Sequence, residues 1–150
     1  MACPLADERV VHAPVLSTIE RESLTTARLV GHAALEKQAE GVVIMDLRLL
    51  SSVTDFFVIC TAGSARQLNA LKEHIETVLL QHGCPVWHTE GTASGALPPS
   101  RVDHDPQWVL LDCGEVVVHL LDQPARAFYR LEELWADAPR IPVVPGVLRV

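Results

Sequence analysis

The sequence predicts an α/β fold with a small mixed β-sheet flanked by helices. Residues 26–40 and 64–82 place apolar side chains at helical spacing, and short apolar runs typical of strands follow each of them. A glycine separates the last two runs, as in a hairpin. Helices that alternate with short strands are typical of α/β domains, and 150 residues of which 49% are hydrophobic suffice for one core.

We divide the chain into three parts. Residues 1–25 contain Pro4, Pro14 and mixed charge without a sustained period, so we expect a loosely ordered N-terminal leader. Residues 26–138 form the single α/β domain. Residues 139–150 combine prolines and a glycine with valines, which favours an extended C-terminal tail over a helix or a central strand.

The first predicted helix spans Thr26–Glu40 and ends at Gly41, where a glycine commonly follows the last turn. Its apolar side is formed by Leu29, Val30, Ala33 and Ala34. The runs Val42–Leu47 and Phe56–Thr61 are short and apolar, so we expect two buried strands joined by a polar segment.

The second predicted helix, Ser64–His82, has the clearest local signal. Ser64 and Gln67 have the spacing of a capping box, and Gly83 follows the last turn. Its core stripe is formed by Leu68, Leu71, Ile75, Val78 and Leu79. Val86–His88 then suggests a brief strand, and residues 89–106 a long loop.

An antiparallel hairpin and a last helix complete the predicted domain. The runs Trp108–Asp112 and Val116–Leu121 flank Gly114, which suits a turn. Pro124 suits the first position of a helix. The apolar spacing of Phe128, Leu131 and Trp135 predicts one short helix that packs these side chains into the core.

Composition and charge exclude several classes of function. The chain has 12 Lys and Arg against 19 Asp and Glu, a net charge of −7, which disfavours direct nucleic-acid binding and suits a basic protein partner. Four scattered cysteines show no zinc spacing, which favours reduced thiols. No apolar run reaches the roughly 20 residues of a membrane helix, and early acidic residues argue against a signal peptide. We therefore expect a cytoplasmic protein without a membrane partner.

A nucleotide site at Gly63-Ser64 is the alternative function. The start of a capped helix can bind phosphate, and a strand, a Gly-Ser turn and a helix open many nucleotidyltransferase-type folds. Nucleotidyl transfer also needs carboxylates that converge on Mg²⁺, usually from the next strand, and Val86–His88 offers none. A capping role for Ser64 is therefore favoured.

The other polar residues near strands favour structural roles. Asp112 and Glu115 flank a turn, where carboxylates commonly accept local backbone N–H groups, and His119 suits a satisfied strand histidine. Asp55 shows no partner for a catalytic triad, and Cys60 and Cys113 lie in hydrophobic runs typical of inert core thiols. We predict no catalytic residue, no cofactor and no metal site, and thus no enzyme.

Aromatic residues are few, 5% of the chain, so their positions are informative. Aromatic side chains supply much of the binding energy of protein interfaces, but cores use them too. Trp108 opens a strand after a long loop and could stand at a sheet edge, whereas Trp135 has the helical spacing of a core residue. Trp87 and Tyr129 are further candidates.

Three blocks together resemble the ribosomal silencing factor family, also called RsfS or Iojap. They are Asp46-Leu-Arg with Ser51-Ser-Val-Thr-Asp-Phe-Phe-Val-Ile-Cys-Thr-Ala-Gly-Ser-Ala-Arg-Gln67, then Trp108-Val-Leu-Leu-Asp-Cys-Gly-Glu-Val-Val-Val-His119, then Ala127-Phe-Tyr-Arg-Leu-Glu-Glu-Leu-Trp135. The resemblance covers roughly residues 26–138 in the same order. It implies a fold similar to nucleotidyltransferases without their catalytic carboxylates.

The resemblance also implies a function and a partner. Members of the family bind the large ribosomal subunit through its protein number fourteen and block joining of the small subunit, which lowers translation under nutrient limitation. Carried over onto this chain, the partner face or its support comprises Trp108, Val109, Leu110, Asp112, His119 and Tyr129. Glu132 and Glu133 could complement a basic partner or simply be solvated. The segment before Trp108 is longer than the family's usual linker, and the oligomeric state, a homodimer included, stays open.

Overall fold

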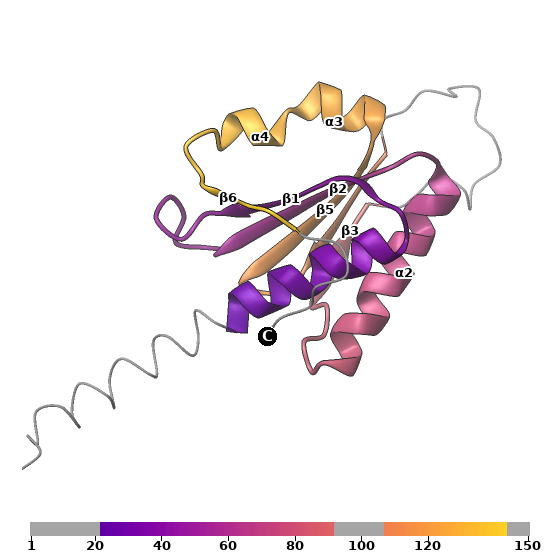
Figure 1. Cartoon of the computed structure of the whole chain (residues 1–150), viewed down its shortest axis with the longest axis horizontal. Helices are drawn as coiled ribbons and strands as arrows, with labels where there is room; N and C mark the ends of the chain where they lie inside the picture. Colours follow the sequence, from indigo (N-terminus) through magenta and orange to yellow (C-terminus); the bar gives the residue numbers. More distant parts are fainter. Residues whose placement is uncertain (1–21, 92–106, 144–150) are drawn as a thin grey trace, which may run out of the picture.

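The computed structural model describes residues 22–91 and 107–143 and has three layers (Figure 1). A six-stranded sheet in the order β3-β4-β5-β2-β1-β6 forms the middle layer. The strands are β1 (Glu40–Asp46), β2 (Phe56–Ala62), β3 (His88–Glu90), β4 (Trp108–Asp112), β5 (Val116–Asp122) and β6 (Arg140–Ile141). An N-terminal helix, described over 22–36, and α2 (Ala65–Gln81) cover one face. On the other face lie α3 (Gln123–Tyr129) and α4 (Leu131–Leu134).

The sheet is mixed, as predicted. Its central strands β2 and β5 run parallel, from Phe56 opposite Val116 to Ala62 opposite Asp122. All other neighbouring strands are antiparallel, and β4 and β5 form the predicted hairpin around Gly114, whose φ is +86°. The fold class is therefore confirmed, with parallel and antiparallel pairs in one small sheet.

Two apolar cores lie on the two faces of the sheet, because side chains alternate along each strand. The larger core joins the N-terminal helix and α2 to inward residues such as Val58, Val118 and Leu120. The smaller core, under α3 and α4, contains Met45, Leu47, Ile59, Leu121, Ala125 and Ala138. Together they account for the apolar runs on both faces of the central strands.

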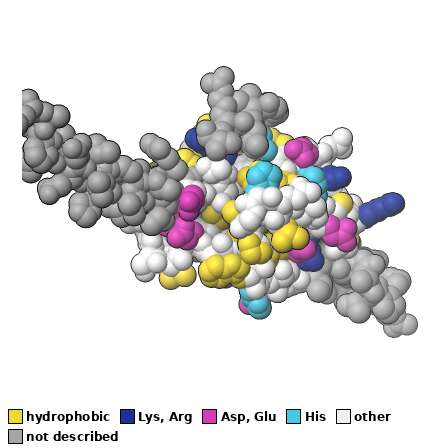
Figure 2. Space-filling model, turned by 90° about the horizontal axis from the view of Figure 1, so that it is seen from below, with side chains coloured by type: hydrophobic (Ala, Val, Ile, Leu, Met, Phe, Trp, Pro, Cys, Tyr) yellow, Lys and Arg dark blue, Asp and Glu magenta, His cyan; other side chains and the backbone are white. Residues whose placement is uncertain are grey.

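The helix α2 confirms the capping prediction. Ser64 is its N-cap, and the Gln67 backbone N–H donates to Ser64 Oγ at 3.1 Å. The predicted stripe is buried except for the half-buried Val78, with Leu68, Leu71, Ile75 and Leu79 fully buried. Figure 2 shows the outer face of this layer, where small apolar patches lie between charged, histidine and polar side chains.

The first helix ends earlier than predicted, at residue 36 and not at Glu40, and it already includes residues 22–25. Gln38 adopts the left-handed conformation, with φ of 61°, and Gln67 Nε2 donates to the carbonyls of Lys37 and Gln38 at 3.2 and 3.0 Å. A side chain from α2 therefore satisfies carbonyls at the helix end. Gly41, the predicted helix stop, lies instead at an irregularity of β1.

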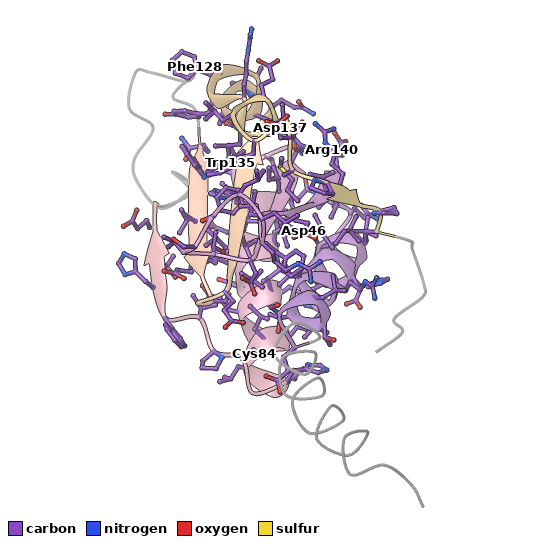
Figure 3. All side chains as sticks on the ribbon, turned by 90° about the vertical axis from the view of Figure 1, so that its left-hand side faces the viewer. Asp46, Cys84, Phe128, Trp135, Asp137 and Arg140 are labelled. Atoms are coloured by element: carbon purple, nitrogen blue, oxygen red, sulfur yellow. The ribbon has the colours of Figure 1, made fainter. Side chains whose placement is uncertain are left out.

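The last predicted helix is two helices. Arg130 has a φ of 49°, and its N–H donates to Arg126 O at 3.2 Å, which ends α3 before α4 begins. The prediction of one continuous stripe was wrong: Phe128 is 73% exposed, whereas Leu131 and Trp135 pack against the smaller core. Figure 3 shows Phe128 directed away from the sheet and Trp135 nearer the strands.

Two smaller differences concern the sheet edges. The brief strand predicted at Val86–His88 lies two residues later, as β3 at His88–Glu90, so Thr89 and Glu90 are not part of the predicted loop. The remainder of that loop from residue 92 to 106 lies outside the described residues. At the other edge, Arg140–Ile141 pairs with Ile44 and Met45 of β1 as β6. The segment predicted as an extended tail thus contributes a short edge strand. No helix within 22–91 or 107–143 is long and apolar enough to cross a membrane.

Two glycines give a matched prediction about stability. Gly91 and Gly83 both have positive φ, +82° and +74°, but a Cβ on Gly91 would collide with the Trp108 carbonyl oxygen, whereas one on Gly83 would meet nothing within 4 Å. We expect Gly91→Ala to lower the free energy of unfolding by about 3 kcal/mol and Gly83→Ala by about 1 kcal/mol, the backbone cost alone. Urea unfolding followed by circular dichroism measures both, and equal losses would contradict the collision.

Candidate partner-binding site

The face of the sheet under α3 and α4 holds most of the predicted site residues. Trp108 stands opposite Leu121, Leu110 opposite His119 and Asp112 opposite Val117, and opposite residues of an antiparallel pair point to the same face. The helix α3 packs over β5 and β2. Beside it, Trp108, Leu110 and Asp112 on β4 remain only half-buried.

An aromatic cluster of Trp108, Phe128 and Tyr129 lies where β4 meets α3. The ring centroids of Trp108 and Tyr129 are 4.6 Å apart, and those of Phe128 and Tyr129 are 5.1 Å apart in an edge arrangement. Tyr129 is 39% exposed and Phe128 is 73% exposed. Exposed aromatic side chains that contact one another form the kind of anchor that protein interfaces use.

His119, on β5, contacts this cluster through Trp108. The Trp108 indole Nε1–H donates to His119 Nδ1 at 3.1 Å, so the neutral ring carries its proton on Nε2. That Nε2 is buried without a hydrogen-bond partner among the described residues, and the ring packs edge-on against Phe57 at 4.6 Å. Burial lowers the pKa of His119 from 6.5 to about 4. The residue fixes the indole and does not itself reach the surface.

The depressed pKa of His119 predicts a pH dependence of stability. Below pH 6.5 His119 is protonated in the unfolded chain, whereas in the folded protein it stays neutral down to about pH 4. The free energy of unfolding therefore falls as pH falls through this range. We expect this to cost up to about 3 kcal/mol by pH 4. His119→Gln keeps an acceptor for Trp108 but cannot titrate, so its stability should fall less between pH 7 and 4. Parallel slopes in urea unfolding would contradict the assignment.

The structure separates the predicted residues by role. Val109 is fully buried on the opposite face, in the larger core, so it can only support the site. Asp112 Oδ1 accepts the Gly114 N–H at 2.8 Å, which confirms the predicted turn role and leaves its second oxygen for other bonds. Trp108, Leu110, Asp112 and Tyr129 are therefore the members that can contact a partner.

The two acidic side chains on α4 differ in how strongly they are bound within the fold. Glu132 is tied within the fold, because it accepts a bond from Arg126 Nε at 2.7 Å, and Arg126 Nη1 also donates to Gly41 O and Thr61 Oγ1. Glu133 has a 72% exposed side chain and only a loose pair with Arg130 at 3.6 Å. Of the two acids considered from the sequence, Glu133 is the one suited to a basic partner.

The Gly63-Ser64 turn offers little to a phosphate. The Gly63 N–H donates to Gln67 Oε1 at 2.7 Å, and Ser64 Oγ accepts the Gln67 N–H. A side chain of the protein therefore already uses donors that phosphate binding would need. No group of three or more His, Cys, Asp or Glu side chains in the described part could hold a metal ion.

Cys60 and Cys113, the two thiols considered from the sequence, are not suited to nucleophilic attack. Burial raises the pKa of Cys60 and of Cys113 to about 12, and the thiolate is the reactive form. Cys60 is fully buried, as predicted from its hydrophobic run. Cys113 is only half-buried beside the turn of the hairpin.

Sequence reasoning missed Phe128 as a member of the site. Its spacing with Leu131 and Trp135 indicated a core residue, but the left-handed Arg130 ends α3 between them, so Phe128 does not share one helical stripe with the other two. Leu134, 72% exposed on α4, was not singled out either. The sequence carries no signal for the break, because arginine is an ordinary helix residue and rarely adopts positive φ.

The fold and this site define a small α/β domain with an exposed aromatic surface. A family model described as ribosomal silencing factor during starvation (RsfS) matches residues 20–149. The ribosomal silencing factor of Halalkalibacterium halodurans is 34% identical over 114 residues, which cover 76% of this chain and 88% of that protein. The chloroplast protein Iojap of Zea mays is 34% identical over 122 residues, 81% of this chain and 48% of that one.

Two solved structures are also similar to this chain. A crystal structure from Chromobacterium violaceum has a TM-score of 0.65 at 27% identity and covers 81% of this chain and 90% of its own. One from Bacillus halodurans has a TM-score of 0.61 at 32% identity, covering 77% and 94%. The chain therefore belongs to the ribosomal silencing factor family, and the resemblance seen in the sequence is confirmed.

Proposed function

We propose that this protein represses translation by binding the large ribosomal subunit through its ribosomal protein number fourteen, so that the small subunit cannot join. The family's name, silencing of ribosomes during starvation, supports the process and its occurrence under nutrient limitation. The aromatic cluster of Trp108, Phe128 and Tyr129 supports the contact, because it is exposed although aromatic residues are rare in this chain.

The proposed binding face combines an apolar centre with acidic surroundings. Leu110 and the aromatic cluster supply apolar area, and Asp112, Glu90 and Glu133 lie on neighbouring elements. Such a face suits a basic protein better than a phosphate backbone, and the net charge of −7 has the same sign. We therefore propose a protein contact on the ribosome with little direct contact to RNA.

Steric exclusion needs no chemical step. A large subunit with this protein on its joining surface is withdrawn from the pool that can pair with small subunits, in proportion to occupancy. The proposed role is thus regulatory and not enzymatic, and the closed Gly63-Ser64 turn agrees with it. The proposed site of action is the cytoplasm, where subunits join. A homodimer stays a prediction.

Gradient sedimentation with separated ribosomal subunits tests the proposal. We expect the full chain to travel with the large subunit, and the same fractions to form fewer joined ribosomes when small subunits are added. Protein that remains at the top of the gradient would contradict the function. Binding to the large subunit without a loss of subunit joining would support the proposed partner but contradict the proposed steric mechanism. Magnesium-dependent nucleotide binding would instead favour the Gly63-Ser64 alternative.

A further inference from the structure

Two half-buried cysteines, Cys84 and Cys113, lie near one end of the sheet. Cys84 follows the end of α2, and its N–H donates to Leu79 O at 2.9 Å. Cys113 follows the last residue of β4, in the turn of the hairpin. Figure 3 shows Cys84 at the end of the molecule opposite to Phe128. Neither cysteine belongs to a helix or a strand, so the backbone around each can adjust.

The segment after Cys84 runs beside the hairpin turn. The Trp87 N–H donates to Asp112 O at 2.8 Å. The Trp87 ring lies over Gly114, since a Cβ on that glycine would be 3.5 Å from the ring. Trp87 therefore contacts the residues on both sides of Cys113. The step of three residues from Cys84 to Trp87 spans at most about 10 Å, so Cys84 begins within reach of the same turn.

The two thiols also point into the same layer. Side chains alternate along a strand, so Cys113 lies on the side of Val109 and Leu111, and all three contact the larger core. Cys84 packs against that core as well. Burial is the main reason that the pKa of Cys113 rises to about 12, and a charge on Cys84 raises it further. Charges interact in this way only when they are close.

We propose that Cys84 and Cys113 are a reversible modification site, which forms an intramolecular disulfide when the protein meets a low-molecular-weight disulfide such as oxidised glutathione. Both are free thiols in the structure. The bond joins the chain after α2 to the turn of the hairpin, which are already in contact through Trp87. The remaining described cysteine, Cys60, is fully buried in β2 and takes no part.

Two exchange steps make this bond. The Cys84 thiolate attacks one sulfur of oxidised glutathione, releases one reduced glutathione and leaves a mixed disulfide on Cys84. The Cys113 thiolate then attacks the Cys84 sulfur and releases the second reduced glutathione. Each protein thiol gives its proton to one glutathione thiolate, and two electrons pass from the protein to glutathione. The high pKa of Cys113 makes it a poor nucleophile toward a free molecule, but its attack on Cys84 is intramolecular, which raises the effective concentration.

The bond affects stability and leaves the candidate partner-binding face open. It closes a loop of about 30 residues, so it removes conformational freedom from the unfolded chain. Leu110 and Asp112 point to the other side of β4 from Cys113, so a bond on the Cys113 side does not cover them. The proposal is therefore independent of the proposed function.

Mass spectrometry of the full chain tests the pairing. After incubation with oxidised glutathione at about pH 8.5, we expect a monomer that is lighter by about 2 Da, the two hydrogen atoms lost for one bond. Its proteolytic fragments should contain Cys84 linked to Cys113. Cys113→Ser should stop at the mixed disulfide and carry one glutathione, and Cys84→Ser should form neither product. The matched control Cys3→Ser should still form the bond.

Urea unfolding followed by circular dichroism measures the effect on stability. The midpoint of the oxidised wild type should lie about 1–2 M higher than that of the reduced protein, and dithiothreitol should reverse the change. Cys84→Ser and Cys113→Ser should have the same midpoint before and after the treatment. Both positions are half-buried, so we expect serine to be tolerated there.

Any of three results would overturn the proposal. The first is a wild type that keeps its mass in oxidised glutathione. The second is a bond from Cys84 or Cys113 to Cys3 or Cys60. The third is a bond between Cys84 and Cys113 that leaves the urea midpoint unchanged or lowers it, because such a bond would be strained and the thiols not positioned to join. None of these measurements involves ribosomes, so their failure and that of the proposed function are distinguishable.

Discussion

The double variant Phe128→Ala/Tyr129→Ala is expected to bind the large ribosomal subunit at least about thirtyfold more weakly than the wild type. The two rings are exposed and in contact with each other, and Tyr129 packs on Trp108. Central aromatic residues of an interface commonly contribute 2 kcal/mol or more each, and the loss of one such contribution alone corresponds to this factor. Cosedimentation at several protein concentrations measures the change.

A control variant tests whether any exposed apolar side chain contributes to binding, or only those of the candidate face. Leu80 is 69% exposed on α2, on the opposite side of the sheet, so Leu80→Ala should leave binding unchanged. Leu80→Ala removes a mostly exposed side chain and should unfold at nearly the wild-type urea concentration, whereas the double variant also loses the packing of Tyr129 on Trp108 and should unfold at a lower one. If the double variant binds like the wild type, α3 lies outside the interface. If Leu80→Ala binds as weakly as the double variant, the loss is not specific to this face.

The second large effect concerns Trp108. Its ring packs between Tyr129 and His119, and its N–H satisfies the buried His119 Nδ1. We expect Trp108→Ala to lower the free energy of unfolding by about 3 kcal/mol, at the lower end for tryptophan because the side chain is half-buried. Trp108→Phe keeps an aromatic ring beside Tyr129 but loses the hydrogen bond and part of the ring volume, which should cost about 1–2 kcal/mol.

Urea unfolding followed by circular dichroism distinguishes these two contributions. A loss for Trp108→Phe as large as that for Trp108→Ala would assign the whole effect to the bond with His119. No loss for either would mean that the ring is not part of the packed structure. Only variants that stay folded at the assay temperature should then be compared for subunit binding, so that stability and contact are not confused.

Local chemistry made most of the fold predictable. The capped helix after Ser64, the hairpin around Gly114 and the buried run of β2 each depend on neighbouring residues, and all three are confirmed. The errors occur where distant parts of the chain decide the outcome. Gln67 satisfies the end of the first helix from 29 and 30 residues away, so Gly41 is not needed as a stop.

The site was predictable in part for the same reason. A tryptophan that opens a strand is visible in the sequence, and Trp108 lies half-buried at the candidate face. Its strand β4 is not the sheet edge, however, because β3 pairs outside it. The alternation along β4 could also have placed Val109 on the opposite face from Leu110. By contrast, no local pattern indicates the break at Arg130 that separates Phe128 from the stripe of Leu131 and Trp135. The contact with the ribosome itself stays a prediction.

The parallel pairing of β2 with β5 has a consequence for how the protein folds. Each residue of β2 meets a residue 60 positions later, whereas the pairs of β1 with β2 and of β4 with β5 are local in sequence. Joining distant segments costs loop entropy before any contact compensates for it, so the two local pairs should form first and their union should limit the rate. During synthesis the centre of the sheet cannot close until residue 122 has left the ribosome. The edge of β2 that pairs with β5 must therefore stay uncovered for most of the chain's own translation.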